Sequence, residues 1–334
     1  MAPLSVPFAL GTFTEPGGPA GEFAGLIAGD RVLDLRNVLG TGYGGQPSVR
    51  DLLGDWAAAL GRLGELAGAP GRWIPADELR AAPPVRPGQI LQSGANYRQH
   101  VIDIIVSEKD SYRGRSAEQV RADAEQMMAT RAAAGEPYLF AGLPSALCGA
   151  RDDIVLPTEG TQHDWELELA VVIGRPARRV PAQTALEYVA GYLICDDITT
   201  RDLVYRPDLD RIGTDWLRAK NSPTFLPAGP FLVPAPQVPD PMDLRITLRH
   251  NGQLRQDAST SDMIFDIATL VSYASQRVPL SPGDLLLTGS PAGNGAHWGE
   301  FLQPGDVIEA EITGPAVQQT LGTQRNVCVK EFPA

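Results

Sequence analysis

Three acidic residues near the middle of the chain have the types and spacing of metal ligands. Glu166 and Glu168 are separated by one residue in the segment 164–173, which ends in the apolar run Ala-Val-Val-Ile. Residues two apart on a β-strand face the same side, with backbones about 7 Å apart, so both carboxylates can converge on one cation. Asp197 follows the apolar residues 192–194, which predict a strand that ends in an acidic turn. We therefore predict that these three carboxylates hold one cation.

Each segment also has a simpler interpretation. An isolated pair of glutamates often lies on the solvated face of a half-buried strand, and the acidic turn could be a solvated loop in which Arg201 pairs with Asp202. The apolar run after Glu168 favours the metal site, because two like charges entering a core would be costly without a counter-cation. Ligands that are all oxygen favour a hard ion, so we expect Mg²⁺, with Mn²⁺ or Ca²⁺ as alternatives. The remaining coordination positions would be left to water and substrate, as a catalytic site requires.

A histidine and a lysine elsewhere in the chain could do acid–base or electrostatic chemistry. His100 and Asp103 are three residues apart, and on one turn of helix the carboxylate could orient the imidazole as a base. Taken alone, His100 could equally be a packing residue, and Lys220 could be a surface lysine. The Gly-containing segment 288–291 could offer backbone N–H groups to an anion or form a plain tight turn.

The N-terminal part of the chain predicts a small α/β domain. Residues 25–35 predict two short strands joined by Gly-Asp at 29–30, a turn pair that tolerates positive φ. From Ser48 to residue 63 apolar side chains recur at helical spacing, which predicts one helix with Ser48 at its cap.

A proline-rich stretch at 81–88 predicts a linker, because proline removes a backbone donor and fixes φ. We place the domain boundary there. The expected organisation is a small N-terminal domain at 1–80 and a catalytic domain at 81–334.

Residues 104–135 could form a lid over the site. Ser116 and Gln119 are placed as the capping box of a helix, and Gly135 lies past its expected end. The charged stretch 107–115 precedes this helix. The alternative is a surface insertion that carries an ordinary amphipathic helix. The apolar stripe of this helix consists of Val120, Ala124, Met127 and Met128.

Beyond residue 135 the chain is rich in predicted strands. Short apolar or alternating segments bounded by Pro and Gly predict strands at 166–173, 244–250, 284–288 and 307–312. Predicted helices are few, at 182–189 and 264–278. We therefore expect a catalytic domain dominated by β-sheet.

Composition and charge limit the function classes. The chain has 334 residues, 43% of them hydrophobic, which is enough for one large core and a smaller one. Its formal net charge of −12 repels nucleic acid and anionic membrane surfaces, so we expect neither as a partner. Three widely spaced cysteines fit reduced thiols in apolar packing. No signal peptide or spanning segment is recognisable, and we expect a cytoplasmic protein.

Several sequence blocks occur in a fixed order along roughly residues 85–330. They are GANYRQH at 94–100, PSAL at 144–147, ELELAVVIG at 166–174, DITTRD at 197–202, DMIF at 262–265 and PGDLLLTGSP at 282–291. In this order they resemble the fumarylacetoacetate hydrolase family. The resemblance implies an α+β fold, in which a twisted β-sandwich roll is joined to a smaller N-terminal domain. It also implies a homodimer and a divalent metal held by Glu166, Glu168 and Asp197.

The same resemblance implies an activity on small 2-oxo acids. The expected reaction is hydrolysis of a C–C bond in an acylpyruvate, a 2,4-dioxo acid, through a metal-stabilised enolate. Decarboxylation, hydration or isomerisation of a 2-oxo acid in aromatic or sugar-acid catabolism is the alternative, because these reactions share the enolate. His100 and Asp103 would activate water, and Lys220 would stabilise the enolate. The residues expected to contact the substrate are Tyr97, Arg201, Gly289 and Ser290.

Some positions depart from the pattern of the family. Asp103 stands where glutamate is usual, Leu143 where many relatives have lysine, and Val204 where several have glutamine. His163 and His297 have no place in the pattern and could line the site or cap loops. These departures keep open a third hypothesis from another class, a non-catalytic module that binds a cation and a carbonyl ligand.

Overall fold

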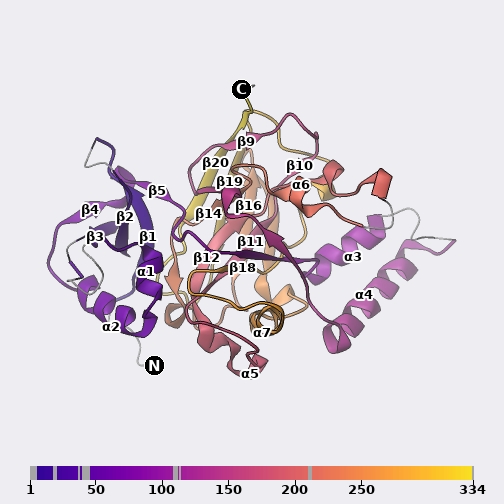
Figure 1. The fold of residues 1–334 in the computed structure, drawn as a ribbon. Coiled ribbons are helices and arrows are strands. Elements are labelled where there is room, and N and C mark those ends of the chain that lie inside the picture. The colour runs from indigo at the N-terminus through magenta and orange to yellow at the C-terminus, as the bar shows by residue number, and fades with distance from the viewer. Residues whose placement is uncertain are drawn as a thin grey trace.

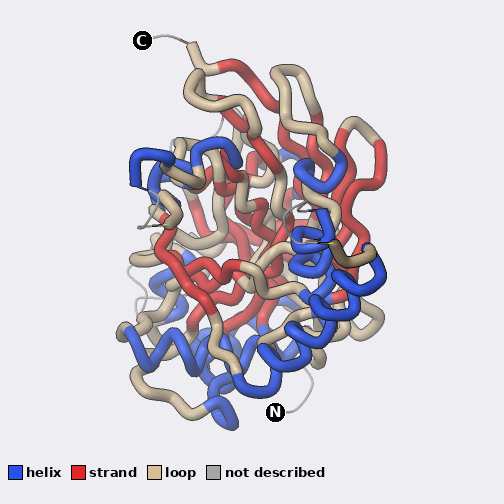
Figure 2. Tube along the Cα trace, turned by 90° about the vertical axis from the view of Figure 1, so that its right-hand side faces the viewer, coloured by secondary structure: helices blue, strands red, loops and turns tan. Residues whose placement is uncertain are grey.

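The computed structural model describes residues 6–17, 21–36, 38–39, 46–107, 112, 114–209 and 213–332. Figure 1 shows a small N-terminal unit at one end, a strand-rich body in the middle, and the helices α3 (Arg98–Ser107) and α4 (Ala117–Ala134) at the other end. In Figure 2 the strands run through the interior and most helices lie at the periphery. The expected α+β fold is confirmed.

The N-terminal unit is a five-stranded sheet with two helices. The strands, in the order β4-β3-β2-β1-β5, are β1 (Ala9–Thr14), β2 (Phe23–Ala28), β3 (Arg31–Asp34), β4 (Trp73–Pro75) and β5 (Arg80–Ala82). The predicted hairpin is confirmed, since β2 pairs with β3 and Gly29 at the turn has φ +61°. The predicted single helix is wrong. It is divided into α1 (Val49–Leu53) and α2 (Trp56–Ala67), because Asp55 caps a new N-terminus while Ser48 caps the first.

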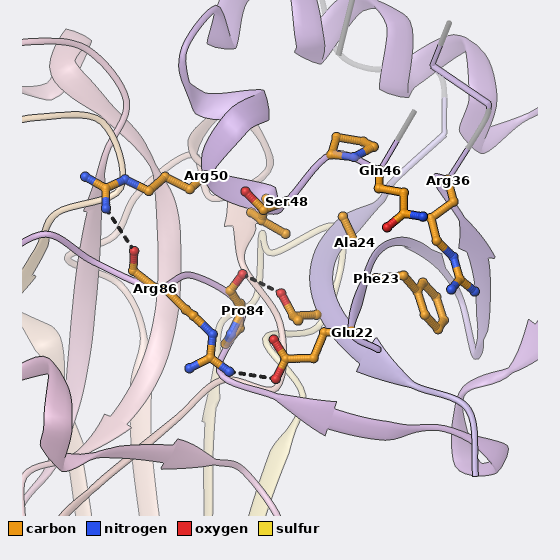
Figure 3. A pocket seen from close by; sticks show the side chains of 12 residues that line it. Glu22, Phe23, Ala24, Arg36, Gln46, Ser48, Arg50, Pro84 and Arg86 are labelled. Carbon is orange, nitrogen blue, oxygen red and sulfur yellow. Dashed lines mark hydrogen bonds and ion pairs between the residues drawn. The ribbon is translucent and has the colours of Figure 1, made fainter. Parts of the chain in front are cut away.

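The predicted linker contributes to this sheet. Its first residues belong to β5, which pairs with β1, so a boundary at residue 80 would cut a strand. The division into domains 1–80 and 81–334 remains a proposal. A cavity of about 330 Å³ lies beside this segment (Figure 3). Arg86 pairs there with Glu22 at 2.6 Å, and Thr12 Oγ1 donates to the carbonyl of Pro84 at 3.0 Å.

An eight-stranded sheet and a second five-stranded sheet form the strand-rich body. The eight-stranded sheet contains β6 (Ile90–Gly94), β7 (Tyr138–Gly142), β8 (Leu147–Gly149), β11 (Leu167–Ile173), β12 (Val189–Asp196), β14 (Leu226–Ala228), β15 (Val233–Pro234) and β18 (Leu285–Leu287). The five-stranded sheet contains β9 (Ile154–Leu156), β16 (Arg245–His250), β17 (Gln253–Ser259), β19 (Val307–Thr313) and β20 (Thr323–Lys330). A two-stranded ribbon joins β10 (His163–Asp164) and β13 (Thr199–Thr200). The predicted strands all occur, with ends shifted by a residue or two.

Strand β11 is covered on both faces. Leu169 and Val171 belong to the hydrophobic cluster shared with the five-stranded sheet. Ala170 and Val172 belong to the cluster shared with the N-terminal sheet and its helices. Because side chains alternate along a strand, each face packs against a different partner. Trp56 of α2 adds a polar link, since its Nε1 donates to the carbonyl of Ala190 at 3.2 Å.

The remaining helices are short, apart from α7. They are α5 (Ala182–Ala185), α6 (Trp216–Lys220), α7 (Ile267–Arg277) and α8 (Gly295–Trp298). The capping box of Ser116 and Gln119 at the start of α4 is confirmed. The predicted stripe of α4 is narrower than expected, because Met127 is 54% exposed while Met128 is buried against the core.

The three cysteines are free and buried, as expected. Among the described residues, no helix has the length and apolar character needed to cross a membrane.

Candidate active site and metal centre

The three predicted ligands lie together. Glu166, Glu168 and Asp197 each offer a carboxylate oxygen, and these oxygens lie within 4.8 Å of one another. The register of the sheet explains this, because β12 runs antiparallel to β11 and Asp197 N donates to the carbonyl of Glu166 at 2.9 Å. Oxygen ligands of Mg²⁺ or Ca²⁺ lie about 2.0–2.6 Å from the ion, so oxygens around one ion are separated by at most about 5 Å. The three carboxylates therefore fit one hard divalent cation.

The same face of β11 changes character along its length. At residues 170 and 172 it is apolar and packs toward the N-terminal sheet, whereas Glu168 within the strand and Glu166, the residue just before it, are acidic and line a cavity. Glu168 is only 2% exposed and Glu166 8%. The solvated-strand alternative is therefore wrong for this pair.

Two side-chain cations already contact the carboxylates. The buried Lys220 Nζ donates to Glu166 Oε2 at 2.8 Å, to Asp197 Oδ2 at 2.5 Å and to Thr199 Oγ1 at 2.6 Å. Arg201 donates to Glu166 and, through Nε, to Asp164 at 2.7 Å. A buried ammonium surrounded by oxygens shows that these groups accommodate a cation.

The pKa values of the carboxylates diverge. Burial works to raise the pKa of Glu166, but Arg201 and Lys220 outweigh it and hold that pKa at about 2. Burial raises the pKa of Asp197 to about 6 against the opposing effect of Lys220. Burial and the charge of Asp197 raise the pKa of Glu168 well above its usual range. A cation that binds Glu168 would therefore displace a proton.

Neighbouring polar groups orient the carboxylates. Gln92 Nε2 donates to Asp197 Oδ1 at 2.6 Å, and the N–H of Gly289 donates to Glu168 Oε2 at 2.6 Å. Asp164, which pairs with Arg201, also accepts hydrogen bonds from the backbone of α8. Such outer contacts fix the direction of metal ligands. The sequence analysis missed Gln92, Asp164 and Thr199, although a glutamine within the apolar strand β6 was a visible signal.

The carboxylates lie at one end of a cavity of about 500 Å³. Its lining comes from β6, β7, β11, α3, α6 and α8 and from the loops after β12 and β18. Of the predicted site residues, the cavity brings together Glu166, Glu168, Asp197, His100, Asp103, Lys220, Arg201 and Ser290.

The predicted substrate contacts are not all at the cavity. Tyr97 is fully buried and does not line it, and burial raises the pKa of its hydroxyl well above the usual value. The N–H of Gly289 is used by Glu168. Ser290 lines the cavity, and its hydroxyl accepts from Gln256 Nε2 at 3.0 Å.

Of the positions that depart from the family pattern, some line the cavity and others do not. Val204 and His297 line the cavity, whereas Leu143 does not and is 41% exposed. His163 contacts Thr200 at 3.0 Å, away from the cavity lining.

His100 is buried in the cavity wall and forms no hydrogen bond with Asp103 among the described interactions. Among the hydrogen bonds described by the structure, Asp103 accepts from Gln99 at 2.6 Å and from Arg121 at 3.4 Å. Its Oδ2 lies 3.9 Å from His297 Nδ1. Burial lowers the pKa of His100 to about 4. His100 is therefore neutral at neutral pH and able to accept a proton, but the structure shows no His100–Asp103 hydrogen bond.

The lowered pKa of His100 predicts a loss of stability in acid. Because the folded pKa lies below the unfolded value of 6.5, the unfolded chain binds more protons between pH 6.5 and 4. Stability should fall as pH decreases through that window, by about 3 kcal/mol in total at 1.36 kcal/mol per unit. His100→Gln should remove this contribution when measured in EDTA. Between pH 7.5 and pH 4.5 the unfolding free energy of the wild type should therefore fall more than that of the variant. A difference that does not change with pH would contradict the burial argument.

The fold and the site define a class: an α+β enzyme whose cavity ends in a candidate centre for a divalent cation. Residues 89–329 match the family described as Fumarylacetoacetate (FAA) hydrolase C-terminal. The chain belongs to the fumarylacetoacetate hydrolase family.

Several proteins of known sequence are similar. A fumarylacetoacetate hydrolase domain-containing protein 2 homolog of Dictyostelium discoideum is 35% identical over 252 residues, which cover 72% of this chain and 73% of that protein. A 2,4-didehydro-3-deoxy-L-rhamnonate hydrolase of Sphingomonas sp. (strain SKA58) is 42% identical over 57% of this chain and 64% of its own length. A mitochondrial oxaloacetate tautomerase of Bos taurus is 41% identical over 53% of this chain and 56% of its own length. The chain thus matches less than two thirds of the last two proteins.

Solved structures resemble nearly the whole chain. The fumarylacetoacetate hydrolase of Exiguobacterium antarcticum superimposes with a TM-score of 0.72 at 27% identity, covering 97% of this chain and 100% of that one. The maleylpyruvate hydrolase of Sphingobium sp. SYK-6, in complex with manganese(II) and pyruvate, superimposes with a TM-score of 0.71 at 26% identity over the same shares. The expected family and its β-sandwich roll are confirmed.

Proposed function

We propose that the protein is a divalent-metal-dependent hydrolase that cleaves a C–C bond of an acylpyruvate. The observation that carries this proposal is the buried set of three carboxylates beside Lys220 in a cavity that also contains the neutral His100. The metal-bound relative with pyruvate and the relative named as a rhamnonate hydrolase support it.

The charges of the site favour a divalent cation. Four buried carboxylates, those of the three ligands and of Asp164, face the side-chain cations Lys220 and Arg201. Among the described residues Glu168 has no ion-pair partner, so a divalent ion would supply the positive charge that this carboxylate lacks. Glu166, Glu168 and Asp197 would hold this ion, with Mg²⁺ or Mn²⁺ as the proposed metal, and it would supply Lewis-acid polarisation of the 2-oxo acid.

The residues of the chain would carry the other steps. His100 accepts a proton from water, whose oxygen attacks the C4 carbonyl. The C3–C4 bond then breaks, its electron pair stays on C3, and the C4 fragment leaves as a carboxylic acid. The ammonium of Lys220 stabilises the developing negative charge of the pyruvate enolate. C3 then takes up the proton held by His100, which gives pyruvate.

The test is a substrate panel with controlled metal. The purified protein, stripped with EDTA, should not cleave acetylpyruvate or fumarylpyruvate, and Mg²⁺ or Mn²⁺ should restore cleavage. His100→Gln should lower kcat by about 10²–10⁴, which is the usual contribution of a general base. Cleavage that persists after complete removal of metal would contradict the proposal.

A second candidate is a tautomerase or decarboxylase of an oxaloacetate-like acid. The missing contact between His100 and Asp103 favours it, because these reactions need no activated water, and one relative is named an oxaloacetate tautomerase. Faster turnover of oxaloacetate than of any acylpyruvate would select this candidate. Inactivity toward the whole panel, with metal still bound, would instead favour a binding module.

Further features of the chain are also proposals. We propose a homodimer, which light scattering of the purified protein would test. The closure of residues 104–135 as a lid and the cytoplasmic location also remain proposals, and residues 108–111 and 113 of that segment lie outside the described residues.

A further inference from the structure

The cavity has an aromatic wall that the sequence analysis did not predict. Tyr138 and Phe140 come from β7, and Trp216 comes from α6. The rings of Phe140 and Trp216 stack with centroids 4.8 Å apart and an interplanar angle of 15°. Trp216 Nε1 donates to the hydroxyl of Tyr138 at 2.8 Å, so the indole is held in place from two sides. These residues present a flat, largely apolar surface to the cavity.

This wall begins next to the carboxylate cluster. Lys220 Nζ, which contacts Glu166 and Asp197, lies 5.8 Å from the ring centroid of Phe140 and 5.8 Å from that of Trp216. In a 2,4-dioxo acid the first atom of the group on C4 is three bonds from C2, which spans roughly 4 Å at about 1.5 Å per bond. A substrate whose 2-oxo carboxylate end is held by the cluster therefore brings its distal group to these rings.

The charges around the distal end do not favour an anion. Among the described residues that line the cavity, the permanent cations are Arg201 and Lys220, and both pair with carboxylates at the inner end. His297 lies 3.9 Å from the carboxylate of Asp103, which itself lines the cavity. Ile104, Ser107, Val204 and Tyr205, which also line the cavity, are uncharged. Asp103 is paired with Arg121 at 3.4 Å, and Arg121 does not line the cavity, so a distal carboxylate would lose water without gaining an unpaired lysine or arginine among the described lining residues.

We propose that this cavity selects a 2-oxo acid with a flat, uncharged distal group, such as an aroyl or conjugated enoyl group, over one with a second carboxylate. This proposal rests on the proposed function, because it assumes that the 2-oxo carboxylate end binds at the carboxylate cluster. Stacking on the wall of Phe140 and Trp216 provides the attraction, and the lack of an unpaired lysine or arginine among the described lining residues provides the discrimination.

The first test measures binding without turnover. Calorimetry on the full chain loaded with Mn²⁺ would compare 2-oxo-4-phenylbutanoate with 2-oxoglutarate, which share the 2-oxo carboxylate and differ in the distal group. We expect the phenyl compound to bind at least tenfold more tightly. Equal or tighter binding of 2-oxoglutarate would overturn the proposal.

Substitutions in the aromatic wall test whether the preference for the phenyl compound comes from Phe140 and Trp216. Trp216→Ala should weaken binding of 2-oxo-4-phenylbutanoate about tenfold and change the affinity for 2-oxobutanoate, which lacks a distal group, less than threefold. Phe140→Leu, which keeps apolar volume but removes the stacked ring, serves the same purpose if the first variant does not fold. Leu217→Ala is the matched control, because Leu217 lies on the same helix, is 67% exposed and does not line the cavity. Equal weakening of all three ligands by both wall variants would overturn the proposal.

A kinetic comparison separates this proposal from the proposed function. With Mn²⁺, kcat/KM should be at least tenfold higher for benzoylpyruvate than for acetylpyruvate. Cleavage of acetylpyruvate without a preference for the aromatic compounds would overturn only the present proposal. Failure to bind any 2-oxo acid and to cleave any acylpyruvate would overturn the proposed function and this proposal with it.

Discussion

Replacing Glu168 by glutamine is expected to abolish metal-dependent turnover while leaving the fold intact. Glutamine keeps the shape of the side chain but removes the charge that a cation would neutralise. Loss of a residue that hydrogen-bonds to a metal ligand lowers metal affinity by about 10–100-fold. Loss of the ligand itself should therefore weaken Mn²⁺ binding by about 100-fold or more. Titration calorimetry with Mn²⁺ and an acylpyruvate assay would measure both effects.

The stability of this variant provides the control for folding. Because burial and Asp197 raise the pKa of Glu168, the charge of this carboxylate is costly without a cation. In EDTA the variant should therefore unfold at the same temperature as the wild type or higher. Glu187→Gln is a matched change, since the side chain of Glu187 is 65% exposed and does not line the cavity. Wild-type affinity of Glu168→Gln for Mn²⁺ would show that Glu168 is not a ligand.

Replacing Lys220 by methionine is expected to lower both the free energy of unfolding and kcat, for two independent reasons. The ammonium of Lys220 is the direct partner of Glu166 and Asp197, and all three groups are buried. Removal of one partner from a buried ion pair costs about 3–5 kcal/mol, because the other charge is left uncompensated. A divalent cation should restore part of this loss, so the destabilisation measured by urea unfolding should be larger in EDTA than in Mn²⁺.

Catalysis by Lys220→Met should remain impaired when metal is present. Loss of one group that stabilises a developing oxyanion lowers kcat by about 10²–10³. Lys330→Met is the matched control, because Lys330 is exposed at the end of β20. Wild-type kcat in the metal-loaded variant would limit Lys220 to a structural role.

The metal ligands could be predicted from the sequence because strand periodicity fixes their direction. Glu166, just before β11, and Glu168, within it, lie two residues apart at the start of the strand, and the apolar residues after them place that strand in the core. The three-residue spacing of His100 and Asp103 was less informative. It places both residues on α3, but the partners of Asp103 come from its own helix, α4 and α8, which no local pattern reveals.

The aromatic wall and the contacts of Lys220 were also beyond sequence reasoning. Phe140 and Trp216 are far apart in the chain and meet only because β7 and α6 pack together. Gly54, the C-cap of α1, is the local sign of the break between α1 and α2, because glycine is unfavourable inside a helix. The helix predicted from Ser48 ends at Leu53, and Asp55 starts the next one.

Because β11 is packed on both faces, the side of the cavity that carries the carboxylates is rigid. The side that carries the aromatic wall tolerates substitution more easily. The backbone amides of Leu169 and Val171 lie in the centre of the molecule, so their hydrogen exchange should require global unfolding. The aromatic wall and its neighbours, in contrast, come from β7 and from the short helices α6 and α8. Substitutions of wall side chains that have no hydrogen bond or ion pair to the carboxylates, such as Phe140 and Trp216, can alter which molecules are accepted while Lys220 keeps its partners, which is a physical route by which one scaffold can acquire different chemistries during evolution.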